Sequence, residues 1–218
     1  MRYFWHAMVG ILTLALIIFV FFAFSLNSGH KISFTNNTLL TEPTVTVADP
    51  SIGDDDAAMT IVNFGDYQCE ACATLDETLT SIAETFPGQI RLVWKDMPNS
   101  SLHAEATNAA VAARCAEKQD KFFEYHAYLF ANQSSLGSDL YIALAEQIGL
   151  KASSFTRCVE NADTLPLVQR SYEEGVALQI AATPTVFLNG ERYTGSLTES
   201  SLTSAIRAML AEITAATK

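Results

Sequence analysis

The chain has 218 residues, and its 24 acidic residues outnumber its 13 Lys and Arg residues to give a formal net charge of −11. Because the basic residues are few and scattered, no basic patch is available to neutralise phosphates, which argues against nucleic acid and anionic membrane surfaces as partners. About thirty residues at the start resemble a targeting sequence. The remainder is long enough for one domain with a real hydrophobic core.

The first element in the chain is a long hydrophobic segment. Residues 3–24 are nearly all apolar, and residues 7–24 contain no ionisable group. A membrane-spanning helix needs ~20 apolar residues, whereas the apolar part of a cleaved signal peptide usually has about 7–15. Arg2 precedes the segment, and the next basic residue is Lys31. We therefore expect residues 1–26 to form a signal anchor, with a cytoplasmic N-terminus and an extracytoplasmic domain.

Cleaved secretion is the alternative, because Ala23, Phe24 and Ser25 place small residues at the spacing that a signal peptidase requires. Both interpretations export the domain, to the periplasm or the cell exterior. Residues 27–50 are rich in Ser, Thr, Asn and Pro, which predicts an extracytoplasmic spacer. Within this spacer, residues 44–47 could form a short first strand.

The next elements are a strand, a pair of cysteines and a helix. Residues 58–64 (AMTIVNF) are apolar on both faces, which predicts a buried central strand. Cys69 and Cys72 follow after a short turn and begin a helical pattern that ends at residues 87–88, Pro-Gly. Residues 90–97 predict a second strand. A strand–helix–strand unit of this kind implies parallel pairing.

The second half of the chain is predicted to be mostly helical. Its last part contains a β-hairpin, with the Asn189-Gly190 turn signal between residues 185–188 and 191–194, and then an amphipathic helix. These patterns alone indicate an α/β domain. The helices before the hairpin are expected at residues 103–131, 139–148, 153–161 and 165–180.

The two cysteines form a Cys-x-x-Cys motif at the start of a helix. Disulfide exchange needs a thiolate nucleophile, a nearby resolving thiol and access for the sulfur of another protein. The free N–H groups and the dipole of a helix N-terminus stabilise the thiolate of the first cysteine. We therefore expect Cys69 to attack and Cys72 to resolve.

A zinc site is the structural alternative for this motif, since half of a four-cysteine site has the same spacing. It would have to recruit Cys115 and Cys158, which are far apart in the sequence and have no Cys-x-x-Cys partner of their own. We therefore predict no metal site and no other cofactor.

A second motif, Thr183-Pro184-Thr185, lies at the predicted start of a strand. Taken alone it is an ordinary proline at the start of a strand, a position that proline tolerates. It becomes informative when it is considered together with Cys69 and Cys72, which precede it in the chain.

Three runs together resemble the DsbA-like thiol–disulfide oxidoreductases, and more narrowly their membrane-anchored bacterial branch. They are PSIGDDDAAMTIVNFGDYQCEAC, AARCAEKQDKFFEYHAYLFANQ and EEGVALQIAATPTVFLNGERYTG. The resemblance implies a thioredoxin fold over residues 51–218 with a helical insert at about residues 101–164. The full expectation for the fold class is α/β, a thioredoxin fold with an inserted helical subdomain, preceded by one N-terminal transmembrane helix.

The resemblance also implies the make-up of the active site. Cys69 and Cys72 would form the redox-active disulfide, and Pro184 would be a cis-proline packed beside it. The backbone of Thr183 would pair with an extended substrate. Active-site support is expected from Tyr67, Glu70 and Ala71, which surround the cysteines.

The chain departs from the family pattern between the cysteines. Strong oxidases of this family usually carry Pro-His there, or another pair that begins with Pro, whereas this chain carries Glu70-Ala71. A carboxylate beside the nucleophile disfavours the thiolate, and a less stabilised thiolate makes a less oxidising couple. Potentials in this class run from roughly −270 to −120 mV. We expect this couple to lie below the oxidising end.

A second departure concerns proton transfer. Many thioredoxin-like proteins bury an acidic residue six positions before the first cysteine, where this chain has Asn63. Asp66 is nearer the motif and could substitute, although a plain turn residue is the simpler interpretation. His126 lies among aromatic residues, which favours a packing role. His103 opens a helix and is expected to be exposed.

Cys115 and Cys158 fall on two helices of the expected insert. Outside the cytoplasm they could form a structural disulfide, which would contribute roughly 4 kcal/mol by the chain-entropy model. The alternative is two buried free thiols.

Three functions compete at this stage. The first is a thiol–disulfide oxidoreductase that forms or shuffles disulfides in cysteine-containing exported polypeptides and is reset by a membrane redox partner, either quinone-linked or reducing. The second is an extracytoplasmic reductase for a specific client. The third is a chaperone or peptide-binding module with an inactive Cys-x-x-Cys, which the intact motif disfavours.

Overall fold

The computed structural model describes residues 39–216. The predicted anchor, residues 1–26, and the first part of the predicted spacer lie outside the described residues. Within residues 39–216, no helix has the length and apolar character needed to cross a membrane.

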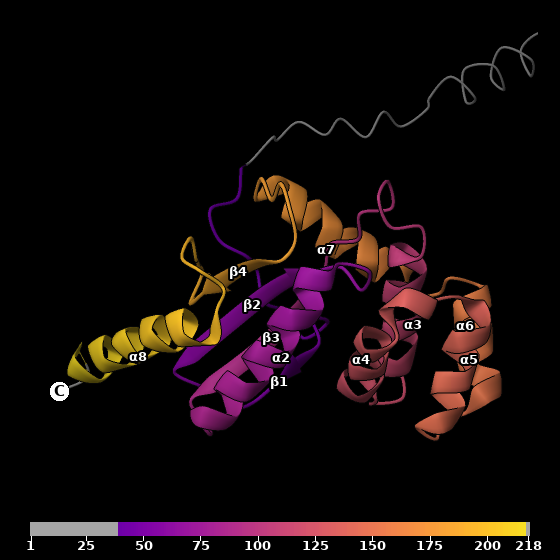
Figure 1. The fold of residues 1–218 in the computed structure, drawn as a ribbon, viewed down its shortest axis with the longest axis horizontal. Helices are drawn as coiled ribbons and strands as arrows, with labels where there is room; N and C mark the ends of the chain where they lie inside the picture. Colours follow the sequence, from indigo (N-terminus) through magenta and orange to yellow (C-terminus); the bar gives the residue numbers. More distant parts are fainter. Residues whose placement is uncertain (1–38, 217–218) are drawn as a thin grey trace, which may run out of the picture. The chain divides into compact units, whose positions relative to one another are not determined.

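A five-stranded sheet forms the centre of the domain, in the order β1-β3-β2-β4-β5. The central strands β2 and β3 are parallel, as the strand–helix–strand unit predicted, and every other pair is antiparallel. Figure 1 shows the strands beside α2 and α8. The strands are β1 (Ser51–Ile52), β2 (Met59–Gly65), β3 (Ile90–Asp96), β4 (Thr185–Leu188) and β5 (Glu191–Arg192).

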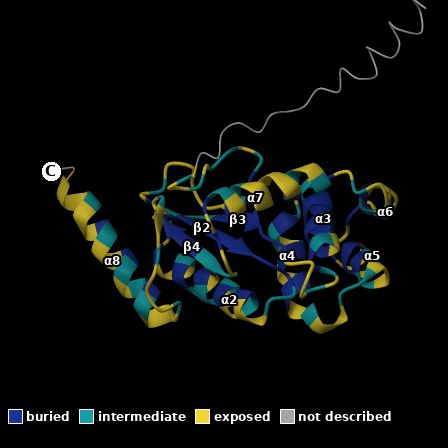
Figure 2. Ribbon diagram, turned by 90° about the horizontal axis from the view of Figure 1, so that it is seen from above, coloured by how far each residue is buried: buried dark blue, intermediate teal, exposed yellow. Residues whose placement is uncertain are grey.

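Strand β2 is buried on both faces, which confirms the prediction of a central strand. Met59 and Ile61 pack with apolar residues of α2 (Glu70–Thr85) and α8 (Glu199–Ala216). Val62 and Phe64 face the other side and pack with residues of β3, β4 and the segment after α7 (Leu165–Ala177). In Figure 2 the buried strands lie between α2 and α7. The sheet thus places the end of β2, and the cysteines after it, between two layers of helices.

The predicted helical insert lies between β3 and α7. The expected helix at residues 103–131 is in fact two helices, because Asp120 adopts a left-handed conformation (φ 59°) that ends the first one. The helices of the insert are α3 (Ala106–Glu117), α4 (Phe122–Ala131), α5 (Ser138–Gln147) and α6 (Ala152–Glu160), with the short 3₁₀ helix η1 (Gln133–Ser135) after α4.

Helix α3 is the centre of the insert. Its alanines Ala109, Ala110, Ala112 and Ala113 are buried, and these small side chains let neighbouring helices approach closely. The same hydrophobic cluster includes Tyr67, Cys72 and Trp94 from the sheet side. The insert and the thioredoxin fold therefore share one core directly behind the cysteines.

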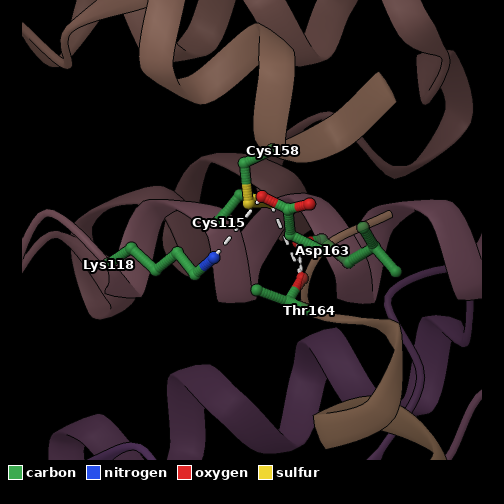
Figure 3. Close-up of a disulfide and its surroundings, with 6 residues drawn as sticks. Cys115, Lys118, Cys158, Asp163 and Thr164 are labelled. Atoms are coloured by element: carbon green, nitrogen blue, oxygen red, sulfur yellow. Dashed lines mark hydrogen bonds and ion pairs between the residues drawn. A yellow bond between two sulfur atoms is a disulfide. The ribbon is translucent and has the colours of Figure 1, made fainter. Parts of the chain in front are cut away.

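The disulfide between Cys115 and Cys158 is present, as predicted, and joins α3 to α6 with their Cα atoms 5.9 Å apart. Figure 3 shows Thr164 beneath the bridge, with its hydroxyl 3.6 Å from the Cys115 sulfur. An ion pair between Lys118 and Asp163, at 3.6 Å, lies beside it. The bridge therefore fastens α6 to α3, the central helix of the insert.

One expectation for the segment before the domain is wrong. Residues 44–47 form no strand, and the edge strand is β1, which pairs with Val93 and Leu92 of β3. The described part of the predicted spacer, residues 39–50, packs on the domain. The physical reason is Lys95, a buried ammonium group whose partners include the Thr44 carbonyl oxygen (2.7 Å) and Asp49 (2.9 Å).

Candidate active site

Cys69 and Cys72 lie where β2 passes into α2, as the sequence predicted. Cys69 is the N-cap residue of α2, and the Cys72 N–H points at the Cys69 sulfur from 3.3 Å. Both cysteines are free thiols, so the structure represents the reduced couple. Cys69 is half-buried whereas Cys72 is fully buried. Only Cys69 can therefore meet the sulfur of another protein directly.

The environments of the two sulfurs separate their pKa values. A hydrogen bond from the Cys72 thiol, supported by the Cys72 N–H and by Thr183, outweighs burial and lowers the pKa of Cys69 to about 6. The same thiol–thiolate contact, together with burial, raises the pKa of Cys72 far above its ordinary value. At neutral pH Cys69 is therefore the thiolate and Cys72 is the protonated thiol, which are the expected roles.

Pro184 follows a cis peptide bond, as predicted. The Thr183 carbonyl oxygen lies 3.6 Å from the Cys69 sulfur. Two segments that are more than a hundred residues apart in the sequence thus meet at the nucleophile.

Tyr67 is buried behind the cysteines and takes part in a short hydrogen-bond chain. Its hydroxyl lies 2.7 Å from Nδ1 of His126, and Nε2 of His126 lies 2.9 Å from a carboxylate oxygen of Asp76 in α2. His126 also packs against Trp94 and Phe130. The predicted packing role of His126 is therefore confirmed, and its bonds to Tyr67 and Asp76 are an addition to it.

Gln133 is an active-site residue that the sequence did not reveal. Its side-chain amide, in η1, donates hydrogen bonds to the carbonyl oxygens of Tyr67 (2.7 Å) and Cys69 (3.0 Å). The helical insert thereby holds the backbone of the cysteine turn from outside the thioredoxin fold. No spacing in the sequence signals this contact, because it joins two elements that only the tertiary fold brings together.

Asp66 and His103 form a pair at the wall of the site, contrary to the expectation of a plain turn residue and an exposed histidine. The Asp66 side chain is completely buried, and one of its oxygens lies 2.9 Å from Nδ1 of His103. The His103 side chain is 28% exposed. A buried carboxylate needs such a partner, which explains why His103 turns inward.

A sequence model described as thioredoxin matches residues 45–208, which is most of the chain. The chain belongs to the thioredoxin family. Its domain resembles BdbD of Bacillus subtilis with a TM-score of 0.70 at 21% identity, covering 80% of this chain and 99% of that one. It resembles the thiol-disulfide exchange protein α-DsbA2 of Wolbachia pipientis with a TM-score of 0.67 at 18% identity, covering 75% and 88%. These likenesses confirm a thioredoxin fold with a helical insertion.

Among curated proteins, the chain is similar to the Na⁺/H⁺ antiporter NhaA 1 of Mycobacterium sp. strain KMS. The two are 33% identical over 159 residues, which cover 72% of this chain and 26% of that protein. The chain thus spans about a quarter of the length of the curated relatives that it matches. The antiporter name describes those longer proteins.

In this thioredoxin-family chain the two residues between the cysteines lie at the surface. Glu70 and Ala71 are both exposed in the first turn of α2. Burial raises the pKa of Cys69 against the effect of its hydrogen bonds, and the charge of Asp66 raises it further. The buried carboxylate of Asp66, three residues before the cysteine, therefore adds to the effects that disfavour the thiolate.

Asn63 is buried in β2, and its side-chain oxygen has no hydrogen-bond partner among the described residues. An amide at this position cannot exchange a proton with Cys72. The four-cysteine zinc alternative also fails, because the disulfide occupies Cys115 and Cys158 and so removes two of the four ligands.

Proposed function

We propose that this chain is a thiol–disulfide oxidoreductase that exchanges the Cys69–Cys72 couple with cysteines of exported polypeptides. The observation that carries the proposal is the asymmetry of the two sulfurs: Cys69 is accessible and its pKa is lowered to about 6, whereas Cys72 is buried and protonated at neutral pH. Disulfide exchange needs this pairing of a reactive thiolate and a protected resolving thiol.

When the couple is oxidised, the Cys69–Cys72 disulfide oxidises two client thiols in two steps. A client thiolate attacks the Cys69 sulfur, the Cys69–Cys72 bond breaks, and Cys72 leaves and takes up a proton. A second client thiolate then attacks the client sulfur of the mixed disulfide, and Cys69 leaves as a thiolate. Two electrons pass from the client to the couple. The same steps in reverse reduce a client disulfide.

The direction of electron flow depends on the reduction potential of the couple. The nucleophilic cysteine has a pKa of roughly 7 in thioredoxin and roughly 3.5 in DsbA. The value of about 6 for Cys69 lies between them and nearer to thioredoxin. We infer a potential below that of the strong oxidases, which keeps reduction of a specific client as the second candidate function.

After each cycle, a redox partner must return Cys69 and Cys72 to their starting oxidation state. An oxidising, quinone-linked membrane protein would remove electrons from Cys69 and Cys72, and a reducing one would supply them. The apolar length of residues 1–26 supports an anchored, extracytoplasmic domain that could meet such a protein. Membrane fractionation with added protease tests this, because cleaved secretion would leave the domain soluble.

A substitution pair tests the assignment of roles. Cys72→Ser should accumulate a mixed disulfide between Cys69 and client cysteines, because the resolving thiol is gone. Cys69→Ser should form none, and it should not catalyse insulin reduction. Mixed disulfides that form through Cys72 in the Cys69→Ser variant would overturn the assignment.

A further inference from the structure

The Asp66–His103 pair lies in the wall of the active site and takes no part in the exchange steps above. Asp66 follows β2 directly, and its carboxylate accepts hydrogen bonds from the Gln68 N–H (2.7 Å) and the Asn99 N–H (2.8 Å) as well as contacting His103. These bonds fix the carboxylate inside the turn that leads to Cys69. It cannot rotate out to water, so its charge is held at one place.

Asp66 lies three residues before the nucleophile, in the turn that leads to it. The Asp66 carbonyl accepts the Cys69 N–H at 3.1 Å, so the turn of residues 66–69 is closed by the same residue. The negative charge of Asp66 opposes the thiolate of Cys69. Whatever neutralises Asp66 must therefore favour the thiolate.

His103 is placed to supply that neutralisation in a pH-dependent way. Histidine is the side chain that ordinarily gains a proton between pH 5 and 8, and His103 keeps partial contact with solvent. Within residues 39–216, no Lys or Arg forms an ion pair with Asp66. Among the described residues, His103 is thus the group that can place a positive charge against the Asp66 carboxylate.

We propose that protonation of His103, transmitted through Asp66, tunes the thiolate of Cys69 and makes the redox poise of the couple depend on pH. This deepens the proposed function and rests on it. When His103 is protonated, the charge of Asp66 is balanced, the thiolate is stabilised, and the reduced couple is favoured. The protein is then the stronger oxidant. When His103 loses its proton, the Asp66 charge stands alone and the protein becomes the weaker oxidant.

Three glutamates lie on the elements that border the pair. Glu105, on the same segment, is held by Tyr141 and Asn108, and its backbone N–H binds the side chain of Gln68. Glu70 begins α2, and Glu173 of α7 lines the cavity that borders the Asn99 loop. All of these charges share the sign of Asp66. None of them can replace the positive charge of His103.

The test is the titration of Cys69 in the reduced full chain, followed by its alkylation rate between pH 4 and 9, a range of about 2.5 units on either side of the ordinary histidine pKa. His103→Gln keeps a hydrogen-bond donor but removes the charge. His103→Lys fixes the charge. We expect His103→Gln to have up to about tenfold less thiolate at pH 6, since one pKa unit is a factor of ten. His103→Lys should keep the low Cys69 pKa of the wild type, and Cys69 in this variant should titrate in one step.

Glu105→Gln is the matched control, because it removes a neighbouring carboxylate that does not contact Asp66, and its titration should follow the wild type. Asp66→Asn should lower the Cys69 pKa. In the Asp66→Asn background, the Cys69 titration should be the same whether residue 103 is the native histidine or carries His103→Gln. If Asp66→Asn does not fold, the Cys69 titrations of His103→Gln and His103→Lys still test the proposal. Identical Cys69 titrations in both would overturn the proposal.

The same preparations separate this proposal from the proposed function. Equilibration of each variant with glutathione at two pH values reports exchange itself. A couple that does not exchange with glutathione contradicts the proposed function, while the alkylation titration still shows whether His103 controls the thiolate. Exchange with a pH dependence that is the same in all three His103 forms contradicts this proposal alone.

Discussion

At the scale of single residues, Cys69 and Cys72 are chemically identical and differ only in their surroundings. Cys69 caps a helix and receives hydrogen bonds, whereas Cys72 is enclosed by the insert and the sheet. A helix N-terminus stabilises a thiolate, and burial destabilises one. The pattern Cys-x-x-Cys therefore indicates the roles, and the tertiary structure determines how far the two pKa values separate.

The lowered pKa of Cys69 should be visible in stability. A group whose pKa is lower in the folded state stabilises that state fully above its unfolded pKa, and the effect is lost as pH falls through the folded value. For Cys69 this window runs from the ordinary 9.0 down to about 6. The melting temperature of the reduced wild type minus that of Cys69→Ser should increase as the pH is raised from about 6 to 9.0. A flat difference would contradict the lowered pKa.

Gln133 gives a second residue-scale prediction. Gln133→Ala removes two hydrogen bonds to the cysteine turn, and we expect a loss of about 1–2 kcal/mol and slower exchange. Gln119→Ala is the control, because the Gln119 side chain also bonds the backbone, accepting the N–H of Lys151, but away from the site. Equal exchange rates in the two variants at equal stability would show that Gln133 does not support the site.

Some site residues could be predicted from the sequence, and others could not. Cys69, Cys72 and Pro184 were predicted because each belongs to a short motif with a known place in this fold. Gln133, and the pairing of Asp66 with His103, were not. They act through contacts between segments that are distant in the sequence, and single-residue patterns carry no record of such contacts.

At the scale of elements, hydrophobic periodicity predicted most strands and helices to within a few residues. The strands β2 and β3 read as apolar runs, and α5, α6 and α7 show helical spacing. The errors arose where another force decided the outcome. Asp120 divides the expected helix at residues 103–131, and residues 44–47 stay outside the sheet while the Thr44 carbonyl oxygen accepts a hydrogen bond from Lys95.

The disulfide between α3 and α6 should stabilise the insert without setting the chemistry of the site. Replacing both Cys115 and Cys158 with Ala should lower the free energy of unfolding by roughly 4 kcal/mol, measured by urea denaturation of the oxidised protein. The reduction potential of the Cys69–Cys72 couple should not change. A shifted potential with an intact fold would show that the bridge is coupled to the active site.

At the scale of the whole domain, the thioredoxin fold, the insert and the segment before β1 depend on a buried network of charges. Lys95 is almost completely buried and pairs with Asp49 and Glu174, so it joins β3 to the N-terminal segment and to α7. Burial raises the pKa of Asp49, but its bonds to Lys95 and Thr46 outweigh this and lower it overall.

Breaking this network should be costly. We expect Asp49→Ala to lower the free energy of unfolding by about 3 kcal/mol, since it leaves a buried charge with fewer partners. Asp163→Ala breaks an exposed pair with Lys118 and should cost less than about 1 kcal/mol. Because the Asp49 pKa is lowered, the Asp49 contribution should disappear as pH falls below about 4, its ordinary value. Equal losses in the two variants would contradict the structural role of the network.

The reduction potential of the Cys69–Cys72 couple, measured by glutathione titration of the domain, tests the proposed chemistry most directly. We expect a reversible two-electron couple between roughly −270 and −120 mV, below the value of DsbA. A value near the lower limit would point to reduction of a client, and a higher one to disulfide donation. A potential at about −120 mV would contradict the opposing role of Asp66. No reversible couple at all would contradict disulfide exchange by this protein.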